Sequence, residues 1–580
     1  MTITPTRATP REAAAAGPSR RRSVRPDRAV SALVVVIVAI LAVLVLYPLY
    51  SVLRTAISGE GWAVFSRLFS TSSNRRVLLN TLVLGVVVGV IGTIVGFFLA
   101  FLQVKVEMRG KKILHLLALM PIIAPPFAVA TSAIVLFGRN GFISEGLFGL
   151  TWNIYGLPGL TLVLSLSFFP VAYMNLVGML RSLDPALDEA ASNLGASKPR
   201  IFWTVTLPML VPGLAASFLL LFIESIADLA NPLVIGGDYT VLAARAYIAI
   251  VGDYNIEAGA AYSLTLLIPA LLVFVLQRYW VSRKSVVTVT GKPNGRPSLI
   301  TGPVARRVLA GIGWAFGALV VLVYGTVLAG GFVKSLGIDN TFTLENYRYV
   351  LFGLGKKAMV DTTTLALIAT PVAGLLGILI AWLVARKLKS SAGVVDFIGM
   401  LGLTVPGTVL GIGYLLAFNH PMTIFGVQIL PALAGGGAMF SGAIAIIMVY
   451  VARSIPAGQR NGIASLEQIG PEIDEASTSL GASGPQTLRK VTLPLIRPAT
   501  VSGLTYAFAR SMTTLSPIIF ITTPGVKIMT AQILAEVDVG RYGNAFAYCT
   551  ILIVLVMMVI GLLNLLVRDP AKVLANLGGS

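Results

Sequence analysis

Apolar runs long enough to cross a membrane recur along the chain, with polar segments between them. Lipid offers no hydrogen-bonding partner to backbone groups, so each run is expected to form a helix. The spans predicted on this basis are residues 30–52, 78–102, 113–137, 157–180, 212–230, 258–280, 307–329, 360–385, 394–418, 432–454, 500–521 and 544–567. The expected fold class is therefore an all-α polytopic membrane protein with about 12 transmembrane helices.

Basic residues gather in the loops that fall on one side if the spans alternate. These residues are Arg20, Arg21, Arg22, Lys105, Arg109, Lys111, Lys112, Arg278, Arg283, Lys284, Arg386, Lys387, Lys389, Arg568 and Lys572. Loops rich in Lys and Arg stay in the cytoplasm, so both termini are expected there. Arg67, Arg75 and Arg76 lie on the other side and are exceptions. Residues 1–29 are rich in Ala, Pro and Arg, which predicts a disordered basic cytoplasmic tail.

The chain contains an internal repeat. Pro185–Pro212 and Pro471–Pro498 align without a gap at an offset of 286 residues, with about half of their positions identical. A repeat of this kind predicts two pseudo-symmetric halves of six spans, related by an axis along the membrane normal. We place the first half at 30–283, a cytoplasmic linker at 284–306 and the second half at 307–580.

The repeated segment lies between two spans and is too polar to cross the membrane. Asp184 is expected to cap a short helix that Pro185 begins and Gly195 ends, and Ser197 to cap a second one. Acidic residues early in the first helix suit its dipole. The second copy has the same order of residues, from Gly470 and Pro471 to Gly481 and Ser483. Two short helices that meet at a glycine form a compact protrusion suited to transfer force to a soluble partner.

Composition supports the membrane assignment and excludes several classes of protein. Charged residues make up 12% and hydrophobic residues 56% of the 580 positions, and the mean hydropathy is +0.86. Soluble domains carry about 25% charged residues, so a soluble enzyme, a disordered chain and a fibrous protein are excluded. The net charge of +20 is spread over loops between apolar runs, which excludes a nucleic-acid partner and indicates membrane lipid.

Metal and thiol chemistry have little support in this sequence. Cys549 is the only cysteine, so no disulfide framework and no paired thiolate site can form. His115 and His420 lie far apart in the sequence and near the ends of spans, where we expect interface residues and not ligands. No metal ligand set is assigned.

The repeated segment resembles the EAA loop of bacterial ABC importer permeases of type I. The matching residues of the first copy are Glu189, Ala190, Ala191 and Gly195, followed by Thr206, Leu207 and Pro208. Those of the second are Glu475, Ala476, Ser477 and Gly481, followed by Thr492, Leu493 and Pro494, with Ser in place of the second Ala. In that family the loop is a coupling helix that docks in a groove of the ATP-binding subunit. The resemblance implies this role for both loops.

The chain has no phosphate-binding loop of the form G-x-x-x-x-G-K-[ST]. We therefore expect the chain not to be an enzyme and to hold no cofactor, with ATP and Mg bound by separate subunits. Two coupling loops imply two copies of an ABC ATPase subunit. The family resemblance also implies an extracytoplasmic substrate-binding protein and a location in the bacterial inner membrane.

Charged residues inside spans are functional candidates because burying a charge in lipid is costly. Glu224 and Asp228 are four residues apart and share one helix face. The repeat offset places Arg510 opposite Glu224, and Thr514 opposite Asp228. If the halves face each other, Glu224 and Arg510 approach one another, either as a structural ion pair or as part of the pathway or gate. The other candidates for the pathway or gate are Ser225, Asp228, Asn231, Ser511 and Thr514.

The sequence around Asp228 suggests a cargo. Ser225, Ala227, Asp228, Asn231 and Pro232, in a chain that fuses two permease halves, resemble the ferric-iron importer permeases. The second half departs from this pattern, with Ser511, Thr513, Thr514 and Pro517. Ferric iron is the cargo that this resemblance implies. Thiamine, polyamines and oxyanions or phosphonate remain alternatives, because permeases for them share the layout or the EAA loop.

Two readings from other classes explain less of the sequence. An ion-coupled secondary transporter also shows repeats and intramembrane charges, but it gives no reason for duplicated coupling loops. A membrane-embedded enzyme would need a paired acid and base that the sequence does not show. Prolines within the spans, including Pro125 and Pro406, can break helices, although we expect them to be tolerated here.

Overall fold

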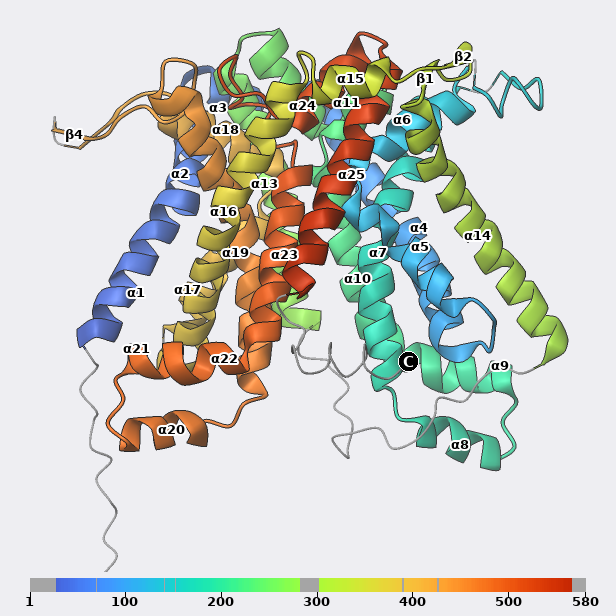
Figure 1. The fold of residues 1–580 in the computed structure, drawn as a ribbon, viewed down its shortest axis with the longest axis horizontal. Coiled ribbons are helices and arrows are strands. Elements are labelled where there is room, and N and C mark those ends of the chain that lie inside the picture. The colour runs from blue at the N-terminus through green and yellow to red at the C-terminus, as the bar shows by residue number, and fades with distance from the viewer. Residues whose placement is uncertain are drawn as a thin grey trace, which may run out of the picture.

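The computed structural model describes residues 28–68, 70–139, 141–151, 153–281, 302–388, 391–424 and 427–565. The tail predicted at 1–29 and the linker predicted at 284–306 lie outside these ranges, except for their last residues. Helices make up nearly all of the regular structure, which confirms the predicted fold class (Figure 1).

The described residues of the first half form thirteen α-helices. They are α1 (Arg28–Leu41), α2 (Tyr47–Ala56), α3 (Gly59–Ser66), α4 (Ser72–Lys105), α5 (Lys111–Ile123), α6 (Pro126–Phe137), α7 (Leu157–Ser182), α8 (Pro185–Asn193), α9 (Lys198–Ile201), α10 (Leu207–Ala227), α11 (Ala230–Ile235), α12 (Leu242–Tyr247) and α13 (Ile256–Leu276). Wider π-helical turns continue the helices at Ala42–Leu46, Phe202–Thr206, Ile248–Gly252 and Gln277–Val281.

The second half repeats this order and adds two small hairpins. Its helices are α14 (Pro303–Gly330), α15 (Glu345–Leu351), α16 (Lys356–Trp382), α17 (Ala392–Thr404), α18 (Gly407–Phe418), α19 (Ala443–Glu467), α20 (Glu472–Ser479), α21 (Gly484–Thr487), α22 (Leu493–Leu495), α23 (Arg497–Thr513), α24 (Met529–Asp538) and α25 (Tyr542–Leu565). Helical turns of other types lie at Leu383–Lys387, Met439–Gly442 and Leu488–Thr492. The antiparallel hairpins pair β1 (Val333–Ser335) with β2 (Asp339–Phe342), and β3 (Met422–Ile424) with β4 (Val427–Leu430).

In the described part of the chain, nine helices are long and apolar enough to cross a membrane, or eleven if each of two bent pairs is one span. The bends are 107° between α5 and α6 and 101° between α17 and α18. They lie at Pro125 and Pro406, which match at an offset of 281 residues, so the expectation that these prolines are tolerated in continuous spans was wrong. The span predicted at 500–521 corresponds to α23, which is shorter because the chain leaves the helical path at Ile496 and again after Thr513.

The internal repeat extends to individual hydrogen bonds. In the first half, the backbone N–H of Leu242 donates to the buried hydroxyl of Thr81 on α4 over 2.8 Å. In the second half, the backbone N–H of Met529 donates to the buried hydroxyl of Thr362 on α16 over the same distance. Each hydroxyl fixes the start of a short helix against a long span.

The first helix of each half packs against the other half. α2 lies along α18, and α14 lies along α5 and α6. The phenolic hydroxyl of Tyr414 on α18 donates to the backbone carbonyl of Leu44 over 2.8 Å, and the rings of Phe169 on α7 and Phe316 on α14 meet edge to face. The halves are therefore interlocked, and the outermost helices bridge them.

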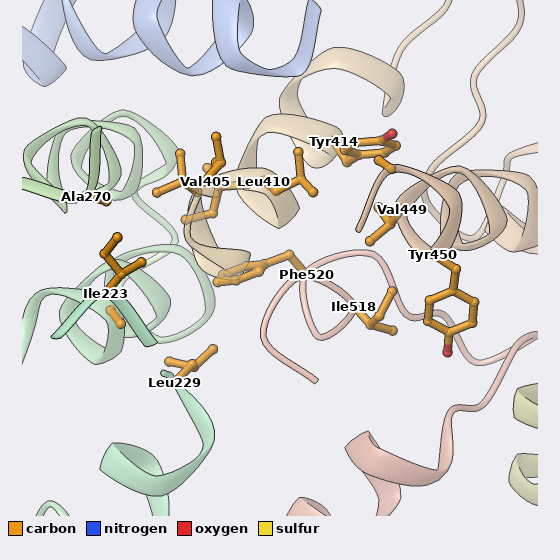
Figure 2. Packing of buried hydrophobic residues seen from close by; sticks show 14 of the residues in the cluster. Ile223, Leu229, Ala270, Val405, Leu410, Tyr414, Val449, Tyr450, Ile518 and Phe520 are labelled. Atoms are coloured by element: carbon orange, nitrogen blue, oxygen red, sulfur yellow. The ribbon is translucent and has the colours of Figure 1, made fainter. Parts of the chain in front are cut away.

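Buried apolar residues of both halves form one continuous cluster. Figure 2 shows Ile223, Leu229 and Ala270 of the first half beside Val405, Leu410 and Phe520 of the second. Because this packing crosses the pseudo-twofold axis, a movement of one half is transmitted to the other.

Candidate functional site: coupling loops and a cavity between the halves

The first repeated loop forms two short helices at one end of the molecule, α8 and α9 (Figure 1). The carboxylate of Asp184 accepts from the backbone N–H of Ala186 over 3.0 Å, so it caps α8 as predicted. Gly195 ends the helix with φ +83°, in the left-handed region. Ser197 makes no side-chain capping bond, so its predicted capping role was wrong.

The second loop, α20 and α21, has the same shape and lies at the same end (Figure 1). Gly481 has φ +86°, and the backbone N–H of Ala482 donates to the carbonyl of Ser477, as Ala196 donates to Ala191 in the first loop. Here Ser483 does cap the second helix, in a capping box with Gln486. The two loops therefore share a left-handed glycine and a matching backbone hydrogen bond, although their sequences have diverged.

The outer surfaces of these loops are exposed. Glu189, Ala190 and Gly195 are exposed in the first loop, and Glu475, Ala476 and Gly481 in the second, with Ala191 and Ser477 half-buried. Neither glutamate forms an ion pair with any residue that the structure describes. Leu194 and Leu480 occupy matching positions beside the glycines and are 89% and 90% exposed.

Matching ion pairs hold the two loops to the membrane helices. Lys105 at the end of α4 binds Asp188 on α8 with an N–O distance of 2.5 Å. Arg386, at the matching end of the helix that continues α16, binds Asp474 on α20 with an N–O distance of 3.1 Å. Arg386 also donates to the backbone carbonyls of Leu466 and Ile469. Each loop is thus bound to a membrane helix of its own half: α8 to α4, and α20 to the helix that continues α16.

The chain after each loop leads straight to the centre of the molecule. In the first half, α9 continues through a π-helical turn into α10, whose 21 residues extend over about 32 Å. α10 ends at Ala227, next to Asp228. In the second half, α21 and α22 lead into α23, which carries Arg510 and ends at Thr513. A displaced loop therefore moves the helix that bears the central charges.

A small cavity of about 70 Å³ lies between the halves at these helix ends. Its walls come from both halves: Phe127, Phe168, Glu224, Ala227, Asp228 and Ala230 from the first, and Gly407, Arg453, Arg510, Thr513, Thr514, Leu515, Ser516 and Pro517 from the second. The structure brings Glu224 and Arg510 together, as the repeat offset predicts, with 3.8 Å between Oε2 of Glu224 and Nη2 of Arg510.

Asp228 is held in the wall of this cavity by its neighbour. Its carboxylate accepts from the backbone N–H and from the side-chain amide of Asn231, both over 2.9 Å. Asn231 is fully buried and does not line the cavity. Thr514 lines the cavity, and its hydroxyl donates to the carbonyl of Arg510.

Ser225 and Ser511 do not belong to the cavity. Their hydroxyls donate to the backbone carbonyls of Phe222 and Ala507 within their own helices, over 2.9 and 2.8 Å. Both serines are buried. They pack against neighbouring helices beside the site and do not face it.

Sequence reasoning missed Arg453, a charged residue of the cavity wall. Its side chain is 8% exposed, and its Nη1 donates to the backbone carbonyl of Val405 over 2.9 Å. Its position inside a predicted span was the signal, because a charge there is a functional candidate. With Arg453, the cavity holds two carboxylates and two guanidinium groups, and the formal charges balance.

The described residues contain no group of three or more His, Cys, Asp or Glu that would hold a metal ion. The side chain of His115 contacts the hydroxyl of Tyr173 over 2.6 Å, and Cys549 is buried among apolar residues. The site is therefore a small charge-balanced cavity between the two halves.

Comparisons with known proteins agree with this architecture. Two segments, residues 92–286 and 373–570, match the family described as "Binding-protein-dependent transport system inner membrane component". The chain belongs to this family of transport permeases. It is a multi-pass inner-membrane protein, and the two matches, one in each half, establish that it is a fused pair of permease domains. Membership of this family rules out the alternative from the sequence analysis, an ion-coupled secondary transporter.

Two permeases that are similar along most of the chain carry names that refer to ferric transport. The ferric transport system permease protein FbpB of Actinobacillus pleuropneumoniae is 36% identical over 510 residues, covering 85% of this chain and 71% of that protein. A putative ferric transport system permease of Haemophilus influenzae is 35% identical over 484 residues, covering 80% and 72%. The molybdenum transport system permease protein ModB of Escherichia coli is 29% identical over 197 residues, covering 33% and 85%.

Proposed function

We propose that this chain is the membrane subunit of an ABC importer for ferric iron. Two copies of a separate ATPase subunit bind its coupling loops from the cytoplasm, and an extracytoplasmic binding protein delivers the iron on the opposite side. ATP and Mg belong to the ATPase subunits, and this chain itself hydrolyses no nucleotide. The observation that carries the proposal is the pair of matching loops, exposed at one end of the molecule and anchored by matching ion pairs.

Each loop is suited to carry movement of an ATPase subunit into the membrane. The exposed glutamate of each first helix and the exposed leucine that follows the helix form the surface for the partner. The ion pairs to Lys105 and Arg386 make each loop move with a second span. Coupling requires that the loops bind the ATPase subunits with different free energy in the inward-open and outward-open states. In this mechanism the ATPase dimer changes the distance between α8 and α20.

Glu224 and Arg510 form the gate in this proposal. They belong to opposite halves, and their groups meet across the cavity. When the halves separate, the pair opens and the two charges face the passage. Asp228 and Arg453 remain fixed by Asn231 and by the carbonyl of Val405, so a polar lining persists while the pair is broken. The balanced charges let cargo pass without a strong binding step in the membrane.

Ferric iron is favoured over an oxyanion by the degree of similarity. Two relatives named for ferric transport are 36% and 35% identical to this chain, with both halves included. The relative named for molybdenum transport is 29% identical over 197 residues. Both termini are placed in the cytoplasm in this proposal, because α1 begins at the end of the molecule where α8 and α20 lie (Figure 1).

The test is uptake by proteoliposomes that contain the chain with its ATPase subunits. With the binding protein outside and ATP inside, we expect ferric iron to accumulate and molybdate to remain outside. Accumulation of molybdate without iron would replace the proposed cargo and leave the coupling mechanism standing. Accumulation of either cargo without ATP would contradict the mechanism itself.

Two single substitutions test the proposed gate. Arg510→Gln leaves Glu224 without its partner, and Glu224→Gln leaves Arg510 without its partner. We expect both single variants to lower uptake, and the exchange Glu224→Arg with Arg510→Glu to recover part of it. Ser225→Ala is the matched control, because Ser225 lies on the same helix but bonds only to the backbone. Equal uptake by the single variants and the control would exclude a role for the pair.

A further inference from the structure

A second cavity, of about 580 Å³, opens at the end of the molecule where the coupling loops lie. It is lined by Glu107, Met108, Arg109, Arg306, Arg307, Ala310 and Trp314. The first three residues belong to the connection between α4 and α5 of the first half, and the others to the first four turns of α14 from the second half. The cavity therefore lies where α14 bridges the two halves.

The lining is strongly basic. Three arginines face one carboxylate, that of Glu107. None of the three arginines forms an ion pair with an acidic residue in the described ranges. Guanidinium groups bind phosphate oxygens in paired hydrogen bonds, so this arrangement favours a phosphate-bearing ligand.

The surroundings of the cavity place it at the membrane surface. Further along α14, Val308, Ile312 and Val321 are 56%, 52% and 53% exposed, which is the surface of a helix that faces lipid. Trp314 lines the cavity together with the arginines and is partly exposed, and Trp is enriched at the level of the lipid headgroups. A phosphate bound here belongs to a molecule with its acyl chains along α14.

The backbone at Gly110 is adapted to this arrangement. Gly110 has φ +79°, and a Cβ there would lie 2.6 Å from Cζ2 of Trp314. Only glycine therefore lets the α4–α5 connection approach the indole ring so closely. The approach fixes the position of Arg109 relative to Arg306 and Arg307 across the junction of the halves.

We propose that this cavity binds the headgroup of an anionic phospholipid from the cytoplasmic leaflet. Arg109 of the first half and Arg306 and Arg307 of the second bind the phosphate together, so the lipid clamps α14 to the α4–α5 connection. A lipid fits better than a soluble phosphate compound, because the cavity continues onto the exposed apolar surface of α14. The assignment to the cytoplasmic leaflet rests on the orientation given in the proposed function, whereas the binding itself depends on neither the cargo nor the ATPase subunits.

The test measures lipid binding to the purified importer complex in detergent by native mass spectrometry. Phosphatidylglycerol is titrated against the wild type and against the triple variant Arg109→Gln, Arg306→Gln, Arg307→Gln. Each basic residue near an anionic surface contributes about a factor of five in affinity, so we expect a loss on the order of 100-fold. Arg→Lys replacements at the same positions keep the charge but lose the paired guanidinium bonds, so we expect a loss smaller than that of the triple Gln variant.

Controls separate this site from general attraction to charge. The variant Arg54→Gln, Arg67→Gln, Arg348→Gln removes three exposed arginines near the opposite end of the spans, and we expect it to bind phosphatidylglycerol like the wild type. Phosphatidylcholine and inorganic phosphate are expected to bind neither the wild type nor the variants at the same concentrations. Equal loss in both triple variants, or competition by inorganic phosphate, would overturn the proposal.

Discussion

Replacing Asp188 by Asn removes the only anionic partner that the described residues give Lys105. The side chains are 9% exposed for Lys105 and 14% exposed for Asp188. Removal of one partner from a buried ion pair costs about 3 to 5 kcal/mol, because it leaves a buried charge without compensation. We expect about 3 kcal/mol of the free energy of unfolding to be lost, since the pair lies near the membrane surface and the Asn carbonyl still accepts one bond.

The second half supplies the matched comparison. Asp474→Asn breaks the equivalent pair, but Arg386 keeps its bonds to the carbonyls of Leu466 and Ile469, at 2.8 and 2.6 Å. The expected cost is therefore lower, about 1 kcal/mol. The same Asp→Asn substitution at the two matching positions should thus lower the free energy of unfolding by amounts that differ about threefold. The reason is that Arg386 keeps two carbonyl partners, whereas Lys105 loses its only anionic partner among the described residues.

Both variants are measured by unfolding in mixed micelles of dodecylmaltoside and SDS, followed by tryptophan fluorescence. Extrapolation to zero denaturant gives the free energies. Adding Lys105→Met to Asp188→Asn removes the unpaired charge and should recover most of the loss. The reasoning fails if Asp188→Asn and Asp474→Asn cost the same, or if Lys105→Met adds its own full cost to that of Asp188→Asn.

Three further changes test other parts of the structure. Gly195→Ala and Gly481→Ala force alanine into the left-handed region and should each cost about 1 kcal/mol in the same unfolding assay, with Asn at these positions costing less. Leu194→Asp with Leu480→Asp should abolish co-purification of the ATPase subunits while unfolding stays as in the wild type, because both side chains are exposed. Thr362→Val leaves the N–H of Met529 unpaired and should cost about 1 to 3 kcal/mol; a cost near zero would show that water replaces the hydroxyl.

The sequence predicted the parts of the site that depend on local chemistry and on the repeat. Asp184, Gly195 and Gly481 act in the structure as their residue types predict, since capping and left-handed turns are decided within a few residues. The approach of Glu224 to Arg510 followed from the repeat offset, because pseudo-symmetry places matched helices opposite each other.

Other features depend on contacts that no local pattern encodes. The first helices of each half pack against the other half, α2 on α18 and α14 on α5 and α6, and these contacts join residues far apart in the sequence. The breaks at Pro125 and Pro406 were missed because proline alone is compatible with a continuous span, although their match between the halves was a signal. Arg453 was overlooked, although an arginine within an apolar run is conspicuous.

The central claim is that two ATPase subunits operate the passage through the matched loops. It is tested most directly by counting ATPase subunits bound per permease chain, with native mass spectrometry of the purified complex. The account predicts two for the wild type and none for the double variant Glu189→Ala, Glu475→Ala, with membrane insertion unchanged. Two bound subunits in the double variant, or none in the wild type, would contradict it.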